Sequence, residues 1–206
     1  MVKLTIPSED ILGDNYNITD ISVSNYNPTI DGTVTLTVTV KDVYGDAVSG
    51  ESVLVTASAG NFTKYNGSTI TGASSYTGTT NSSGQFTLTY ACTEWGLITF
   101  SANNRAIQAH VTGWRGITAG TGQLWVNDET KTAAYYFTRT GTITSELSYS
   151  NAIPSGYRPK SNVRMKAHNS QSVFLTIESG GTVKVNGTSS SSITVAAQIT
   201  YGYDIQ

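Results

Sequence analysis

The chain has 206 residues, of which 13% are charged, and its formal net charge is -2. The chain has no excess of basic residues to attract phosphates, so its composition disfavours binding to nucleic acids and electrostatic binding to a membrane surface. The length allows one large domain or two small ones.

Threonine and serine dominate the composition and together supply 56 of the 206 residues. This usage is typical of short strands joined by tight turns. No apolar run approaches the roughly 18 residues that a membrane-spanning helix needs, which predicts no membrane insertion. The first residues, MVKLTIPSEDILGD, lack an apolar segment after Lys3, so we expect no signal peptide.

The N-terminal segment, residues 1–19, has no sustained hydrophobic period and contains Pro7 and Gly13. We expect an extended arm that anchors onto another protein or stays mobile. Strand patterning begins at Ile21. In TVTLTVTVKD, residues 33–42, four apolar side chains alternate with four threonines. This period of two predicts a strand with one buried face and one exposed face.

Residues 42–112 continue as short strands. VYGDAVSGES, residues 43–52, places Gly45 and Gly50 on either side of a short Ala47-Val48 step, which predicts a hairpin-like connection. A segment rich in Gly, Asn and Ser follows from 60 to 84. The alternating apolar residues of the other strands are Val53, Val55, Phe86, Leu88, Tyr90, Ile98, Phe100, Ile107, Ala109 and Val111. This spacing predicts an antiparallel sandwich of about 90 residues.

Residues 20–112 resemble the bacterial immunoglobulin-like domain of group 1, the repeat of invasin- and intimin-type adhesins. Its most specific parts are a D-x-x-G-x-x-V-x-G turn and a Ser83-Gly84 turn before a strand. The first turn is formed by Asp42, Gly45, Val48 and Gly50. NSSG stands where the family usually has an aspartate, which weakens the second turn match but not the strand pattern. The resemblance implies an immunoglobulin-like β-sandwich.

From Gly113 the strand pattern starts again. Leu124 and Val126 mark one strand, and AAYYFTRTG, residues 133–141, predicts a second. Later strands are expected in VRMKAHN, SVFLTIESGGTVKVNG and SITVAAQITYGYD, with a hairpin turn at Gly180-Gly181. We therefore predict an all-β chain in which residues 113–206 form a second antiparallel β-sandwich that is jelly-roll-like.

Two segments of this second part, IPSGYRP (153–159) and GGTVKVNG (180–187), resemble the C-terminal head modules of bacteriophage tail-fibre and receptor-binding proteins. In that family a similar corner precedes a hairpin with a similar turn. The matching residues are Pro154, Gly156, Tyr157, Arg158, Pro159, Gly181, Thr182, Val183 and Gly187. Related modules form trimers, so the resemblance implies a homotrimer.

An adhesin-like domain belongs outside a cell, yet no signal peptide, lipid motif or anchor is visible if Met1 is the natural start. Virion proteins assemble in the host cytoplasm and reach the outside by lysis. We therefore expect a protein of the virion surface. A segment trimmed from a secreted adhesin would look similar, so this expectation depends on Met1.

The sequence lacks the motifs of catalysis and metal binding. It has no HExxH, no GxSxG, no phosphate-binding loop and no Cys/His metal spacing. The adjacent acidic pairs Glu9-Asp10 and Asp128-Glu129 would face opposite ways on a strand. Cys92 has no partner cysteine and is expected to be a small buried thiol. We expect no enzyme, no cofactor and no metal site.

Sugar binding needs only exposed aromatic faces and a few planar polar groups. Our candidate ligand-binding residues are Trp114, Tyr136, Tyr157, Arg158, Arg164 and His168. For Tyr157 and Arg158 the structural alternative is a fixed corner, held by packing of the tyrosine ring and by arginine bonds to carbonyl oxygens or to a neighbouring subunit.

The aromatic residues of the second part divide between core and surface. Strand alternation places Tyr135 and Phe137 on one face and Tyr136 on the other. We assign Trp125 and Phe137 to the core. For Tyr136 and Trp114, the core, a trimer interface and a ligand site all stay open.

These observations lead to a non-enzymatic virion surface protein, a phage-type tail fibre or head fibre, as the first hypothesis. Residues 1–19 would attach to capsid or tail proteins, residues 20–112 would act as a spacer, and residues 113–206 would adhere to a glycan or protein of the host surface. The alternatives are a capsid or tail decoration protein with a structural role and a fragment of a cellular surface adhesin.

Overall fold

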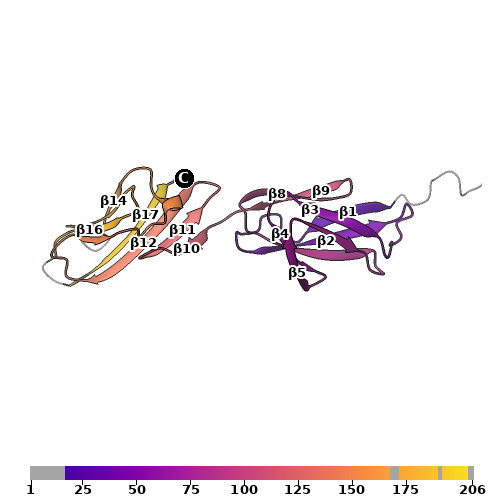
Figure 1. The fold of residues 1–206 in the computed structure, drawn as a ribbon, viewed down its shortest axis with the longest axis horizontal. Helices are drawn as coiled ribbons and strands as arrows, with labels where there is room; N and C mark the ends of the chain where they lie inside the picture. Colours follow the sequence, from indigo (N-terminus) through magenta and orange to yellow (C-terminus); the bar gives the residue numbers. More distant parts are fainter. Residues whose placement is uncertain (1–16, 168–171, 190–191, 204–206) are drawn as a thin grey trace, which may run out of the picture. The chain divides into compact units, whose positions relative to one another are not determined.

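The computed structural model describes residues 17–167, 172–189 and 192–203. In this part of the chain, regular structure consists of antiparallel strands and one short 3-10 helix. The chain divides into two compact units, Met1–Thr112 and Gly113–Gln206, here called the N-terminal unit and the C-terminal unit (Figure 1). The prediction of an all-β fold is confirmed.

The N-terminal unit consists of two sheets. Its strands are β1 (Ile18–Val23), β2 (Thr33–Lys41), β3 (Ser52–Ala57), β4 (Asn61–Tyr65), β5 (Ser68–Ala73), β6 (Ser75–Thr79), β7 (Gln85–Ala91), β8 (Gly96–Ala102) and β9 (Arg105–Val111). One sheet has the order β1-β2-β7-β4-β5 and the other β6-β3-β8-β9. The order β1-β2-β7-β4 corresponds to strands A-B-E-D of an immunoglobulin sandwich, and β3-β8-β9 to C-F-G. The immunoglobulin-like prediction is therefore confirmed.

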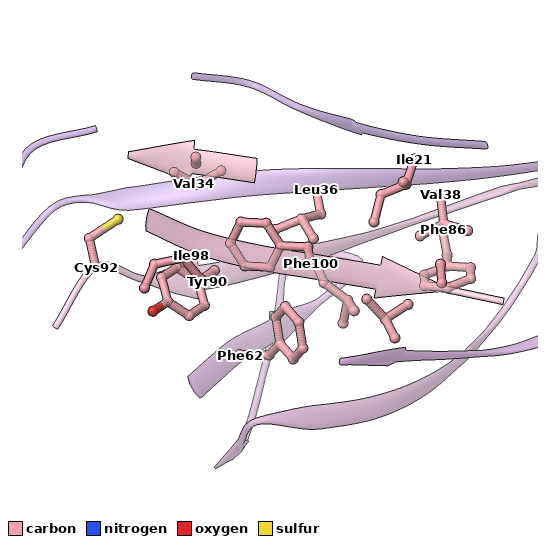
Figure 2. Close-up of a cluster of buried hydrophobic side chains, with 14 of the residues drawn as sticks. Ile21, Val34, Leu36, Val38, Phe62, Phe86, Tyr90, Cys92, Ile98 and Phe100 are labelled. Carbon is pink, nitrogen blue, oxygen red and sulfur yellow. The ribbon is translucent and has the colours of Figure 1, made fainter. Parts of the chain in front are cut away.

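The core of the N-terminal unit follows the alternation of the sequence. Val34, Leu36, Val38 and Val40 of β2 are fully buried, while the threonines between them face outward. Burial of each such side chain contributes about 1.5–3 kcal/mol. Figure 2 shows Phe62, Tyr90 and Phe100 from three different strands gathered in this core. Their ring centroids lie 5.0 to 6.2 Å apart.

Two predictions about the edges of this unit need correction. β1 begins at Ile18, so residues 18 and 19 belong to a sheet rather than to an arm. Thr19 is buried, and its hydroxyl accepts a hydrogen bond of 2.7 Å from the Asn103 amide. Residues 1–16 of the expected arm lie outside the described residues. The segment 60–84, for which no strands were predicted, contains β4, β5 and β6.

After β2 the chain makes a local turn and then passes from one sheet to the other. Asp42 Oδ1 accepts hydrogen bonds of 2.9 Å from the backbone N–H groups of Tyr44 and Asp46, and Lys41 forms a bridge with Ala47. β2 and β3, however, lie in different sheets. The prediction of a hairpin-like connection is correct for the turn and wrong for the pairing of the two strands.

The C-terminal unit also consists of two sheets. Its elements are β10 (Arg115–Ile117), β11 (Gln123–Asn127), β12 (Thr132–Gly141), β13 (Leu147–Tyr149), the 3-10 helix η1 (Ser155–Tyr157), β14 (Val163–Lys166), β15 (Val173–Ile177), β16 (Val183–Gly187) and β17 (Ile193–Gly202). The sheet orders are β10-β11-β12-β17 and β13-β16-β15-β14, each four-stranded. This strand number agrees with the jelly-roll-like sandwich expected from the sequence.

The core of the C-terminal unit receives side chains from both sheets. Tyr135 and Phe137 of β12 are buried, as predicted, and the Phe137 ring lies 5.6 Å from the Tyr149 ring of the other sheet. The assignment of Trp125 to the core is wrong, because 47% of this residue is exposed. Leu124 and Val126 occupy the inner face of β11, so Trp125 between them projects outward.

Candidate functional site

The outer face of the sheet β10-β11-β12-β17 carries two exposed aromatic side chains. Trp125 is 47% exposed and Tyr136 is 40% exposed. Trp125 pairs directly with Ala134, so Tyr136 is its diagonal neighbour on β12. Diagonal neighbours lie about 7–8 Å apart and are within reach of large rings. The two rings therefore share one surface.

The strand register arranges this surface in two rows. One row runs Gly116–Trp125–Ala134–Thr200 across the four strands, and the other runs Gln123–Tyr136–Gln198 across three. We call these seven residues the aromatic face. None of the seven is charged. Gln123, Gln198 and Thr200 carry amides or a hydroxyl that both donate and accept hydrogen bonds, as does the phenol of Tyr136.

Small neighbours let the Trp125 ring lie against the sheet. A Cβ placed on Gly116 would be only 3.3 Å from Cζ3 of the indole, so the ring leans over the backbone of β10. Ala134 on the other side is also small. One face of the indole is thus supported by protein while the side chain remains about half exposed.

A shallow depression of about 370 Å³ lies beside Trp125. It is lined by the β10–β11 connection, including Thr118, Gly122 and Gln123. The connection is held from the core side, because the Tyr135 hydroxyl donates a hydrogen bond of 2.7 Å to the Thr121 carbonyl oxygen. Burial raises the pKa of Tyr135, so this phenol stays a neutral donor. The depression is a fixed extension of the aromatic face.

The structure places the residues that the sequence nominated on different elements of the C-terminal unit. Tyr136 lies on the aromatic face. Trp114 is 44% exposed and immediately precedes β10. Arg164 is exposed on β14 of the other sheet, with its guanidinium 4.0 Å from the centroid of the Phe174 ring. His168 lies outside the described residues.

Tyr157 and Arg158 form a structural corner. The Tyr157 ring packs edge-on against Tyr203 with centroids 5.3 Å apart. Arg158 Nε donates to the Ile153 carbonyl oxygen at 3.3 Å, and the Ile153 N–H donates to the Gly181 carbonyl oxygen at 3.0 Å. The corner is therefore tied to the β15–β16 turn, which is the structural alternative considered for these two residues.

The outer face of the second sheet has a different chemistry. Lys184 on β16 forms ion pairs with Glu178 at 2.8 Å and with Glu146 at 3.5 Å. The hydrogen bond to Glu178, together with the nearby carboxylates, raises the pKa of Lys184. Lys184 on this sheet is thus paired with carboxylates and Arg164 lies over an aromatic ring, in contrast to the uncharged aromatic face.

Trp125 is the site residue that sequence reasoning missed. Its large aromatic ring suggested that it belongs to the core, but the strand pattern around it indicated an exposed position. Leu124 and Val126 marked a strand with apolar residues at every second position, and side chains alternate along a strand, so Trp125 between them faces the other way. The glutamines at 123 and 198 carried no signal, because the strand register that brings them beside Tyr136 is set by tertiary structure.

A larger concave region of about 770 Å³ lies on the N-terminal unit. Its lining mixes Asp20 and Asp42 with Lys41 and Arg105, beside Tyr44, which is 83% exposed. Asp42 is already engaged by backbone donors of the turn. The mixed charges do not select one class of ligand.

Groups that could support catalysis are sparse among the described residues. Cys92 is fully buried, and burial raises the pKa of its thiol, which disfavours the reactive thiolate. No cluster of three or more potential metal ligands occurs in the described part of the chain. The same part contains no helix of the length and hydrophobicity needed to cross a membrane.

No protein-family model and no curated protein matches the chain. Among solved structures, invasin, described as a bacterial integrin-binding protein, aligns with 92% of the chain at 11% identity and a TM-score of 0.43. FdeC, an Escherichia coli adhesin, aligns with 89% at 15% identity and a TM-score of 0.38. Domains 4 and 5 of the S-layer protein SbsC align with 46% at 24% identity and a TM-score of 0.28.

The chain spans 40% of the invasin structure, 63% of the FdeC structure and 51% of the SbsC structure. Each TM-score is below 0.5. The assignment of an immunoglobulin-type fold therefore rests on the strand order of the N-terminal unit.

Proposed function

We propose that the chain is a non-enzymatic adhesion protein of the virion surface whose C-terminal unit binds a glycan of the host. The observation that carries this proposal is the pair of exposed rings, Trp125 and Tyr136, on one uncharged sheet face. Exposed aromatic rings beside amides provide the apolar platform and the hydrogen bonds that sugar recognition requires.

The assignment to a virion rests on the resemblance of IPSGYRP and GGTVKVNG to phage head modules. Support comes from the contact between the two segments, since the Ile153 N–H donates to the Gly181 carbonyl oxygen at 3.0 Å. A shared corner and hairpin would explain why both motifs occur together. In this proposal the N-terminal unit is a spacer, and residues 1–16 attach to capsid or tail proteins.

Binding of this kind gains strength from copy number. A single shallow face gives weak attachment, because little of a ligand's surface is enclosed. Several copies on one particle would raise the overall affinity by about 10²-fold or more without any new contact. We therefore expect the isolated chain to bind weakly and many copies of the chain on one particle to bind strongly.

Two binding assays test the proposal. The purified chain, coupled to beads, is incubated with cells on which the particle propagates, and separately the chain with and without residues 1–16 is incubated with particles that lack it. We expect the beads to bind cells, and the truncated chain to lose particle binding. Binding to particles without any binding to cells would refute adhesion and leave a structural decoration protein.

A further inference from the structure

The aromatic face is chemically selective, and this selectivity deepens the proposed function. We propose that it binds a neutral saccharide chain of two or more sugar units, which lies across the strands from the depression beside Trp125 to Tyr136. This inference rests on the proposed function, because it names the ligand class of the same face. Three features of the face lead to it.

The first feature is the absence of ionic groups from the two rows. Acidic sugars are recognised through arginine or lysine, and none of the seven residues of the aromatic face is basic. The basic residues of the same strands are directed elsewhere. Arg115 pairs with the buried Val126 and so faces inward, and Arg139 donates a hydrogen bond of 2.6 Å to the Tyr149 hydroxyl. A carboxylate or sulfate would lose hydration on this face and gain no counter-charge.

The second feature is the alternation of flat rings and amides. Tyr136 stands between Gln123 on β11 and Gln198 on β17, and both glutamines are exposed. Each amide presents donors and an acceptor, which matches the hydroxyl groups of a neutral sugar. The supported Trp125 ring can cover the apolar face of a second sugar. Two separate platforms on diagonal positions favour a chain over a single monosaccharide.

The third feature is the depression itself. Its volume of about 370 Å³ is at the lower end of the range of ligand pockets, roughly 300–1,000 Å³, so it suits one small group rather than a whole oligosaccharide. It is lined by Gly116 and Thr118 on one side and by Gln123 and Trp125 of β11 on the other. A sugar unit placed there borders Trp125 and also Gln123, which pairs with Tyr136 on β12.

The experiment measures binding of the full chain to defined oligosaccharides by calorimetry. The probes are neutral hexose and N-acetylhexosamine oligomers of one to four units, together with uronic-acid oligomers of the same lengths, each at low and high NaCl. We expect binding to at least one neutral series, stronger for two or more units than for one, and changed less than twofold by salt. The uronic-acid series should bind at least tenfold more weakly.

Variants connect this binding to the face. Trp125→Ala and Tyr136→Ala should each weaken binding at least tenfold, and Gln198→Ala several-fold, whereas Trp125→Phe should retain part of the affinity. Tyr26→Ala is the matched control, because Tyr26 is 56% exposed and lies on the N-terminal unit. Its affinity should equal that of the unmodified chain.

Three results would overturn the inference: preference for the acidic oligomers with strong salt dependence, unchanged affinity in Trp125→Ala, or no binding to any neutral series. Each is distinguishable from failure of the proposed function, which is judged by the cell-binding assay. A chain that binds cells but prefers acidic sugars would retain the proposed function and lose this inference.

Discussion

At the scale of single residues, adjacent glycines in the β15–β16 turn have different roles. Gly181 has φ of +84°, and a Cβ there would be 2.5 Å from Arg158 Nε and 2.6 Å from the Ile153 carbonyl oxygen. Gly180 has open space around it. Gly181→Ala should therefore lower the free energy of unfolding by about 1–3 kcal/mol, measured by urea denaturation. Gly180→Ala is the control, and equal losses in both variants would contradict the proposed role of the corner.

Ionisation of Tyr90 should lower the stability of the N-terminal unit at alkaline pH. Burial, with smaller effects of Cys92 and Glu94, raises the pKa of Tyr90 from 10.0 to about 12. The folded state thus favours the neutral phenol, so its stabilisation is complete below pH 10 and is lost as the pH rises from 10 through 12. The hydroxyl donates to the Ala59 carbonyl oxygen at 3.0 Å, so Tyr90→Phe should cost about 1 kcal/mol at neutral pH.

The test compares unfolding free energies of the two proteins by urea denaturation across this pH range. Phe cannot ionise, so the advantage of the unmodified chain should shrink between pH 10 and pH 12. A difference that stays constant over this window would mean that Tyr90 titrates alike in the folded and unfolded states.

Single residues also mark how far the site could be predicted. Tyr136 was identified because strand alternation separates it from Tyr135 and Phe137. Trp125 was missed because its ring suggested burial, although the same alternation places it outside. Gln123 and Gln198 could not be found from the sequence, since they meet Tyr136 only through pairing across β11, β12 and β17.

At the scale of elements, two neighbouring residues of β12 face opposite sides of the sheet, one toward the core and one toward the surface. Phe137 is buried against the second sheet, whereas Tyr136 faces outward. Phe137→Ala should lower the free energy of unfolding of the C-terminal unit by about 3–5 kcal/mol. Tyr136→Ala, a similar truncation on the same strand, should cost about 1 kcal/mol or less. Similar losses in urea denaturation would show that the outer face is also packed.

The elements predicted best were those with one fully buried face. β2, β7 and β8 place apolar side chains on every second position, so their alternation is visible in the sequence. β5 and β6 were missed because nearly all of their side chains are exposed or half-buried, which leaves no hydrophobic period to detect. The change of layer after β2 was also invisible, because a turn sequence fixes local geometry but not the partner of the next strand.

At the scale of the whole molecule, we expect three copies of the chain to associate, because related phage head modules form trimers. Light scattering of the purified protein at micromolar concentration should give three times the chain mass of 21.9 kDa. Such an assembly would present three aromatic faces and supply the avidity that a shallow face lacks. A mass equal to one chain would contradict the trimer, while leaving the face of each chain unchanged.

The central claim is that adhesion depends on the aromatic face of the C-terminal unit. Its most direct test is the attachment of the full chain to host cells, measured for the unmodified protein, for the Trp125→Ala/Tyr136→Ala double variant and for the Tyr26→Ala control. Both exposed sites should tolerate truncation, so the double variant should remain folded. We predict that the unmodified chain and the control bind cells equally and that the folded double variant loses nearly all attachment. Undiminished attachment by the folded double variant would contradict the claim.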